Sequence, residues 1–133
     1  MKCLIVEDDF MSRRILKELL LSVGDCDIAV NGQEAIASFH FAHESKRPYD
    51  VIFMDIMMPV IDGMEALLCI RNLERKMGIP PNLAVKVVMT TALDDPHTVI
   101  KSYNKCEADS FIVKPLNTQK LFKELRELKL LVS

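Results

Sequence analysis

Ile5-Val6-Glu7-Asp8-Asp9 is the stretch that decides the fold, because an apolar run ends there directly in three carboxylates. Two further runs end in a similar way: Phe53-Met54-Asp55 ends in a carboxylate, and Val113-Lys114-Pro115 ends in a lysine. Each run is typical of a buried strand, and the downstream ends of such strands are where open α/β folds build their sites. We therefore expect the carboxylates and the lysine to meet at one edge of a sheet.

Strands and helices alternate along the chain. Apolar runs predict strands at residues 2–7, 26–30, 50–55, 84–90 and 109–113, and apolar residues at helical spacing predict a helix after each of them, the fourth from about residue 95. Strands separated by helices run parallel, and right-handed crossovers cover both faces of the sheet. The pattern therefore predicts an α/β fold, a doubly wound five-stranded parallel sheet. A flavodoxin-like strand order of 2-1-3-4-5, adopted from known folds of this kind, would open a crevice between the first and third strands.

Composition excludes several classes of protein. Half of the 133 residues are apolar and 27% are charged, so we expect one globular domain over residues 1–133. The net charge of −2 and the lack of a lysine or arginine run argue against direct nucleic-acid binding. The first residues resemble neither a signal peptide nor a membrane span, so we expect no membrane insertion and a cytoplasmic location.

Two groups of residues have ordinary structural interpretations. The cysteines, Cys3, Cys26, Cys69 and Cys106, are far apart in the sequence and form no Cys-x-x-Cys pair. We expect them to be buried, reduced thiols. Arg13-Arg14 is expected to lie on a solvated helical face.

The residues at the strand ends favour chemistry on phosphoryl groups. Carboxylates brought together repel one another, and Mg²⁺ suits such a cluster because it accepts one or two carboxylates and keeps positions for water and phosphate oxygens. No glycine-rich phosphate loop is present. Lys114 would supply a compact cation, and Thr90 or Thr91 a hydroxyl donor. Asp55 is then the natural nucleophile.

These motifs resemble the response-regulator receiver domain of two-component signalling. The resemblance covers Cys3 to about Leu130, and its motifs are specific in their order and spacing. They are Val6-Glu7-Asp8-Asp9, Met54-Asp55-Ile56-Met57-Met58-Pro59, Asp62-Gly63, Met89-Thr90-Thr91-Ala92 and Val113-Lys114-Pro115.

The resemblance implies a role for each site residue. Asp55 would be the phosphoacceptor and Lys114 the cation for the phosphoryl oxygens. Mg²⁺ would be bound by Asp8, by Asp55, by the backbone carbonyl of Met57 and, through water, by Glu7. Thr91 would be the switch hydroxyl, and Phe111 would replace the aromatic switch residue that is often tyrosine. Lys114-Pro115 is expected to be a cis peptide.

The resemblance also implies a function and partners. We expect the chain to accept a phosphoryl group from a histidine kinase or a histidine phosphotransfer protein. We expect it to signal through the face formed by the fourth helix, the fifth strand and the fifth helix, with Val99, Ile100 and Tyr103 as candidate contacts. It would be no enzyme beyond catalysing its own phosphorylation and dephosphorylation. We expect a stand-alone protein similar to chemotaxis regulators, with a receiver of a longer protein as the alternative. A homodimer is also possible.

Three positions depart from the common pattern of the family. Met57 and Leu93 are apolar where polar residues are frequent, and both would flank the path of the water that hydrolyses the acyl phosphate. Slower self-dephosphorylation is expected as a result. Glu107 stands where glycine is common.

Two other functions are alternatives. One is a receiver-like interaction module that works without phosphorylation, although Asp8, Asp55 and Lys114 are all present. The other is a Mg²⁺-dependent phosphohydrolase of the haloacid-dehalogenase kind. That class carries its nucleophile in an Asp-x-Asp motif on the first strand, which is absent here.

Overall fold

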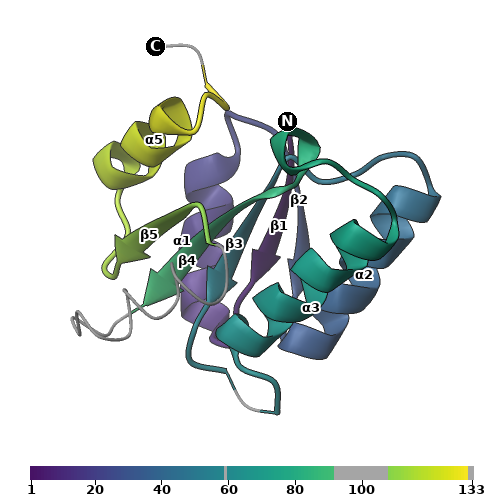
Figure 1. The fold of residues 1–133 in the computed structure, drawn as a ribbon. Coiled ribbons are helices and arrows are strands. Elements are labelled where there is room, and N and C mark those ends of the chain that lie inside the picture. The colour runs from purple at the N-terminus through teal and green to yellow at the C-terminus, as the bar shows by residue number, and fades with distance from the viewer. Residues whose placement is uncertain (59, 92–107, 132–133) are drawn as a thin grey trace.

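A five-stranded parallel sheet forms the centre of the molecule (Figure 1). The computed structural model describes residues 1–58, 60–91 and 108–131. The strand order is β2-β1-β3-β4-β5, which confirms the predicted flavodoxin-like order. The strands are β1 (Lys2–Val6), β2 (Asp25–Ala29), β3 (Val51–Asp55), β4 (Lys86–Thr91) and β5 (Ser110–Val113).

Four α-helices connect and follow these strands within the described residues: α1 (Phe10–Leu20), α2 (Gly32–Glu44), α3 (Gly63–Lys76) and α5 (Thr118–Glu127). Each begins after an Asp or Asn whose side chain accepts a hydrogen bond from a backbone N–H of the first turn. The helix predicted from about residue 95 lies outside the described residues. The predicted start of the fourth strand at Ala84 is two residues too early, because a 3₁₀ turn, η1 (Pro81–Leu83), comes before β4.

Helices cover both faces of the sheet (Figure 1). Alternate residues of a strand point to opposite faces, and β3, which is buried at all five positions, therefore contributes to two cores. Ile52 and Met54 pack in the core beneath α2 and α3, whereas Val51 and Phe53 pack in the core beneath α1 and α5. Fully burying one such side chain contributes about 1.5–3 kcal/mol, so the two cores hold the sheet between its helices.

The parallel strands place their carboxyl ends at one edge, as the arrowheads in Figure 1 show. Gly63 allows α3 to begin close to the end of β3. A Cβ atom at this position would lie 2.2 Å from the backbone oxygen of Asp55. Only glycine permits such an approach without a shift of the backbone, so Gly63 helps to shape the loop beside Asp55.

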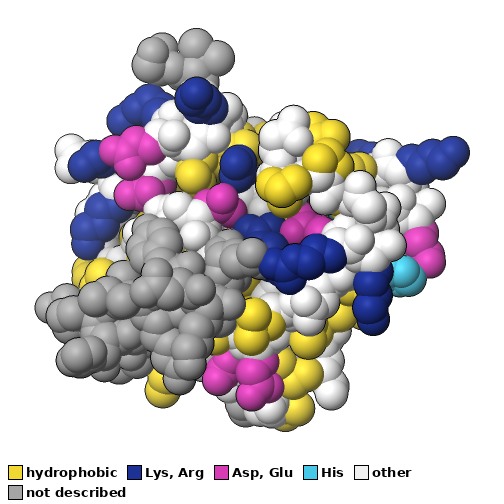
Figure 2. Space-filling model, viewed as in Figure 1, with side chains coloured by type: hydrophobic (Ala, Val, Ile, Leu, Met, Phe, Trp, Pro, Cys, Tyr) yellow, Lys and Arg dark blue, Asp and Glu magenta, His cyan; other side chains and the backbone are white. Residues whose placement is uncertain are grey.

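Acidic and basic side chains of the described residues are interspersed on the face of the molecule shown in Figure 2. Among residues 1–58, 60–91 and 108–131, no helix combines the length and the apolar character that a membrane crossing needs.

Candidate functional site

Three carboxylates converge at the carboxyl ends of β1 and β3. Glu7 and Asp8 directly follow β1, and Asp55 is the last residue of β3. One carboxylate oxygen from each lies within 4.8 Å of the other two. Glu7 and Asp55 are each only 4% exposed, whereas Asp8 is exposed. The structure therefore brings together the acidic residues that the sequence predicted to meet.

Lys114 supplies the positive charge of this site. Its backbone N–H donates to the carbonyl oxygen of Thr91 at 2.7 Å, which fixes the position of the residue beyond the end of β5. Its Nζ donates to Oε1 of Glu7 at 2.6 Å and lies 3.7 Å from Oδ1 of Asp55. The closest partner of the lysine is therefore Glu7, although Asp55 is within ion-pair range. The peptide bond between Lys114 and Pro115 is cis, as the resemblance implied.

The two buried carboxyl groups differ in their pKa values. Burial, the hydrogen bond with Glu7 and the charge of Glu7 raise the pKa of Asp55 to about 7. Burial also acts to raise the pKa of Glu7, but its hydrogen bonds with Asp55, Lys114 and the backbone of Asp9 outweigh burial and lower this pKa. In the protein without a metal, Glu7 therefore keeps its negative charge more readily than Asp55 does.

The donor atoms of this site fit a hard divalent cation. Among the described residues, Lys114 is the one cation that forms ion pairs with these three carboxylates, so the carboxylates outnumber it, and their ligand atoms are all oxygens, as Mg²⁺ prefers. Both oxygens of Glu7 already accept hydrogen bonds, one from Lys114 and the other from the N–H of Asp9 at 3.3 Å. Asp8 and Asp55 are thus the carboxylates best placed to bind a cation directly.

Met57 lies beside Asp55 in the loop that follows β3. Its backbone N–H donates to Oδ1 of Asp55 at 3.3 Å, and its side chain is 61% exposed. The backbone of Met57 is therefore tied to the acidic cluster, while most of the residue is exposed. Leu93, the second apolar position predicted beside the site, lies outside the described residues.

Thr91 and Phe111 lie on the same face of the sheet. Met89 pairs with Phe111 in the register of β4 and β5, and Thr91 is two residues beyond Met89. Thr91 is fully buried, and Phe111 is partly buried against the core beneath α2 and α3. The predicted switch residues thus share one packed layer. The predicted contacts Val99, Ile100 and Tyr103, and the departure at Glu107, lie outside the described residues.

The sequence interpretation missed one basic residue of this site. The guanidinium group of Arg13 donates to the backbone oxygens of Glu7 at 3.1 Å and of Asp8 at 2.9 Å. The expectation of a solvated face was wrong for this partly buried arginine, whereas Arg14 is exposed and pairs with Glu18. The sequence feature that could have predicted these contacts is the position of Arg13, one turn into α1. The first turn of a helix lies against the loop that precedes it, which here contains Glu7 and Asp8.

Comparison with known proteins agrees with this geometry. The family model described as the response regulator receiver domain matches residues 3–126. The chain belongs to this family. The match spans nearly the whole sequence, so the receiver assignment does not rest on the acidic motif alone.

Relatives of this receiver domain include much longer proteins. This chain is 37% identical over 123 residues to hybrid signal transduction histidine kinase B of Dictyostelium discoideum. The match covers 88% of this chain and 6% of the kinase. The chain is 32% identical over 126 residues to the probable transcriptional regulator ycf29 of Porphyra purpurea, covering 94% of this chain and 54% of that protein. The chain thus spans only a small part of the curated kinases that it matches.

Solved receiver structures have the same fold. The receiver domain of the histidine kinase CKI1 from Arabidopsis thaliana, complexed with Mg²⁺ and BeF₃⁻, has a TM-score of 0.82 at 26% identity, covering 98% of this chain and 90% of that one. Chemotaxis protein CheY4 of Vibrio cholerae has a TM-score of 0.76 at 27% identity, covering 95% of this chain and 96% of that one.

Proposed function

We propose that this receiver domain accepts a phosphoryl group on Asp55 in a Mg²⁺-dependent reaction. The observation that carries the proposal is the meeting of Asp55 with Glu7, Asp8 and Lys114 at the carboxyl edge of the sheet. Of the three carboxylates, only that of Asp55 belongs to the last residue of a strand. The ammonium group of Lys114 lies 3.7 Å from a carboxylate oxygen of Asp55. A buried carboxylate next to a cation is the arrangement that a phosphoryl acceptor requires.

Asp8 and Asp55 would bind the metal directly, together with the backbone carbonyl of Met57, and Glu7 would act through water. The two hydrogen bonds that Glu7 already accepts support this division of roles. Bound Mg²⁺ would supply positive charge that offsets the repulsion between the carboxylates and the phosphoryl oxygens. That the relative CKI1 was solved with Mg²⁺ supports the same choice of metal.

The chemical step would be carried by Asp55 and Lys114. A carboxylate oxygen of Asp55 attacks the phosphorus of the donor, an O–P bond forms, and the bond from phosphorus to the leaving group breaks. Lys114 would move its contact from Glu7 toward the new phosphoryl oxygens, since its Nζ lies within ion-pair range of both Glu7 and Asp55. The chain would act only on itself in this step and in the later hydrolysis, so it would not be an enzyme in the usual sense.

Thr91 and Phe111 would then transmit the change. A phosphoryl group carries about −2 charge and strong acceptor oxygens, which can draw the Thr91 hydroxyl toward Asp55. Phe111 lies in the same layer as Thr91 and could respond by repacking against the core beneath α2 and α3. The resulting surface would include β5 and α5, together with the helix predicted from about residue 95.

The phosphodonor would be a histidine kinase or a histidine phosphotransfer protein. The hybrid histidine kinases among the relatives support this class of donor, because each contains a segment similar to this chain. The downstream protein partner and a homodimer through the last two helices stay predictions, as does a cytoplasmic location.

The test is phosphorylation by a small donor followed by intact mass. The protein is incubated with acetyl phosphate, with Mg²⁺ or with a chelator, alongside Asp55→Asn and the matched control Asp25→Asn, which changes an exposed aspartate of β2 at the amino edge of the sheet. We expect one phosphoryl group on the wild type and on Asp25→Asn with Mg²⁺, and none on Asp55→Asn.

Two other results would replace the proposal. Bound Mg²⁺ without an adduct would favour an interaction module that works without phosphorylation. Continuous release of phosphate from several unrelated phosphate esters would favour a phosphohydrolase. Either result would leave the receiver fold intact and change only the role of Asp55.

A further inference from the structure

Two cysteines that are far apart in the sequence are neighbours in the sheet. Cys3 of β1 pairs directly with Cys26 of β2 in the parallel register. Residues paired in this way point to the same face, and both cysteines pack with the core beneath α1 and α5. The two thiols are close enough for each to shift the pKa of the other.

The spacing of the strands suits a disulfide. Neighbouring strands lie about 4.7–4.9 Å apart, and disulfides join Cα atoms separated by about 4.4–6.8 Å. Cys3 is fully buried, whereas Cys26 is partly exposed because β2 is the edge strand. Cys26 is therefore the member of the pair nearer to solvent, while Cys3 stays in the core beside it.

The surroundings make Cys26 the more reactive thiol. The hydrogen bond with Cys3 lowers the pKa of Cys26 against the opposing effect of burial, and the ammonium group of Lys17 on α1 lowers it further. The same hydrogen bond, together with burial, raises the pKa of Cys3. Because the thiolate is the reactive form, oxidation is expected to begin at Cys26.

We propose that Cys3 and Cys26 form a peroxide-sensitive dithiol, in which Cys26 is oxidised first and Cys3 resolves it into a disulfide between β1 and β2. The Cys26 thiolate attacks one oxygen of hydrogen peroxide and an S–O bond forms. The O–O bond breaks and hydroxide leaves, which takes a proton to become water. The Cys3 sulfur then attacks the Cys26 sulfur, the S–S bond forms, and the S–O bond breaks. The Cys3 proton leaves with the departing hydroxide as a second water, so two thiols reduce one peroxide.

This dithiol is separate from the acidic site. Cys3 lies near the amino end of β1 and Glu7 directly follows its carboxyl end, a span of roughly 13 Å at about 3.3 Å per residue. The sequence expectation of buried thiols is confirmed for Cys3, is only partly met by Cys26, which is partly exposed, and is wrong for Cys69, which is exposed on α3. Cys69 lies on α3, beyond the opposite face of the sheet, so replacing it leaves the surroundings of the pair unchanged. Cys106 lies outside the described residues.

The test uses the full chain carrying Cys69→Ser and Cys106→Ser, so that only the proposed pair remains. Hydrogen peroxide is added to the folded protein, free thiols are then alkylated in denaturant, and the intact mass is measured. We expect the loss of two hydrogens with no alkylation, and two alkylated cysteines after treatment with dithiothreitol. Adding Cys26→Ser should leave Cys3 reduced, and adding Cys3→Ala should leave a sulfenic acid on Cys26 that dimedone captures.

Other outcomes would overturn the proposal. One is that both thiols of the folded protein stay free at a peroxide dose that does oxidise the denatured chain. The others are a disulfide that forms only between separate molecules, and stepwise oxygen addition to Cys26 without a disulfide. Circular dichroism of each variant shows whether its fold is intact. The variant that retains both cysteines and the Cys26→Ser variant carry the test even if Cys3→Ala does not fold.

Discussion

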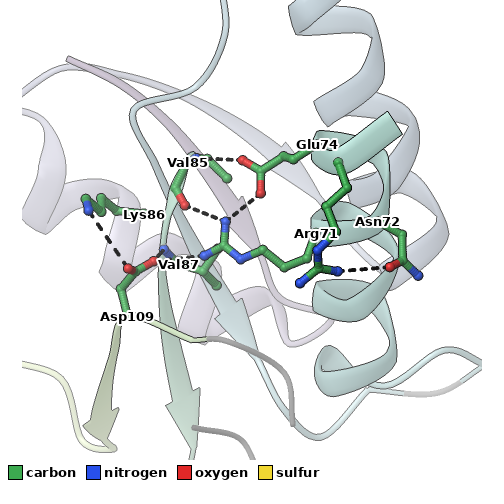
Figure 3. Close-up of polar contacts among 8 residues, drawn as sticks. Arg71, Asn72, Glu74, Val85, Lys86, Val87 and Asp109 are labelled. Carbon is green, nitrogen blue, oxygen red and sulfur yellow. Dashed lines mark hydrogen bonds and ion pairs between the residues drawn. The ribbon is translucent and has the colours of Figure 1, made fainter. Parts of the chain in front are cut away.

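Two clusters of charged side chains lie at opposite edges of the same sheet, and they differ in how their charges are balanced. At the carboxyl edge, Glu7, Asp8 and Asp55 face one ammonium group from Lys114. At the amino edge, Arg71 and Lys86 face the carboxylates of Glu74 and Asp109 (Figure 3). With every carboxyl group ionised, the three carboxylates of the first cluster outnumber the Lys114 ammonium and the neighbouring Arg13 guanidinium, whereas the described residues of the second cluster supply two cations for two carboxylates.

The cluster at the amino edge is also rich in hydrogen bonds. Arg71 donates to Glu74 at 2.8 Å, to the carbonyl oxygen of Val85 at 2.8 Å and to Asp109 at 2.9 Å (Figure 3). Glu74 and Asp109 in turn accept hydrogen bonds from the N–H groups of Val85 and Val87. This cluster ties α3 to the starts of β4 and β5. The contrast teaches that a cluster with balanced charges can stabilise the fold, whereas a cluster with excess carboxylates can bind a further cation.

The largest expected loss of stability comes from breaking the balanced cluster, that is, the cluster around Arg71. Arg71→Met should lower the free energy of unfolding by about 3–5 kcal/mol, because it leaves the buried Glu74 and the partly buried Asp109 without their main cation. Urea unfolding measures this loss. Arg75→Met, which changes an exposed arginine one turn further along α3, is the control and should cost less than about 1 kcal/mol. Equal losses in the two variants would refute the structural role of the balanced cluster.

At the unbalanced cluster of Glu7, Asp8 and Asp55, removing a charge is expected to raise the free energy of unfolding. The pKa of Asp55, raised to about 7, means that the folded protein favours the protonated carboxyl. The stability linked to that proton is complete below about pH 4 and is lost as the pH rises through 7. In the presence of a chelator, Asp55→Asn should therefore raise the free energy of unfolding at about pH 8, by about 1–3 kcal/mol.

The same comparison at low pH and with metal provides the controls. Near pH 4 the gain from Asp55→Asn should shrink, because the wild-type carboxyl is then protonated. Saturating Mg²⁺ should stabilise the wild type more than Asp55→Asn and so reduce or reverse the gain at about pH 8. A loss of stability in the variant at every pH would mean that Asp55 is balanced in the same way as Glu74.

A kinetic prediction concerns the apolar residues around Asp55. Because Met57 and Leu93 would hinder the attacking water, we expect the double variant Met57→Asn/Leu93→Gln to shorten the half-life of the phosphorylated protein by about tenfold, or about 1.4 kcal/mol of barrier. Loss of the labelled phosphoryl group over time measures the half-life. Met77→Asn, at an exposed methionine that follows α3, is the control. An unchanged half-life in the double variant would exclude this explanation of the apolar residues.

The smallest effect concerns backbone strain beside the unbalanced cluster. Val60, in the loop between β3 and α3, has a φ of 70° and is 80% exposed. A β-branched residue is unfavourable in this left-handed region, whereas asparagine tolerates it. Val60→Asn should therefore raise the free energy of unfolding by about 1 kcal/mol, measured by thermal unfolding. Lys129→Asn, at a second positive φ of 62° far along the chain, should gain less because lysine is not β-branched.

The sequence by itself determined the alternation of strands and helices and the carboxyl-edge site. Both follow from local patterns, since apolar runs and helical spacing are written in consecutive residues and parallel strands must end at one edge. The predicted meeting of Glu7, Asp8, Asp55 and Lys114 agrees with the structure for this reason. The roles of Thr91 and Phe111 rest on the resemblance, and the structure adds that they share a layer.

Only the tertiary structure decided which distant residues are partners. The preference of Lys114 for Glu7 over Asp55, the contacts of Arg13 and the pairing of Cys3 with Cys26 depend on strand register and side-chain direction. The cluster around Arg71 likewise joins residues up to 38 positions apart. No local pattern encodes such pairs, because register and packing are set by the simultaneous burial of both faces of the sheet.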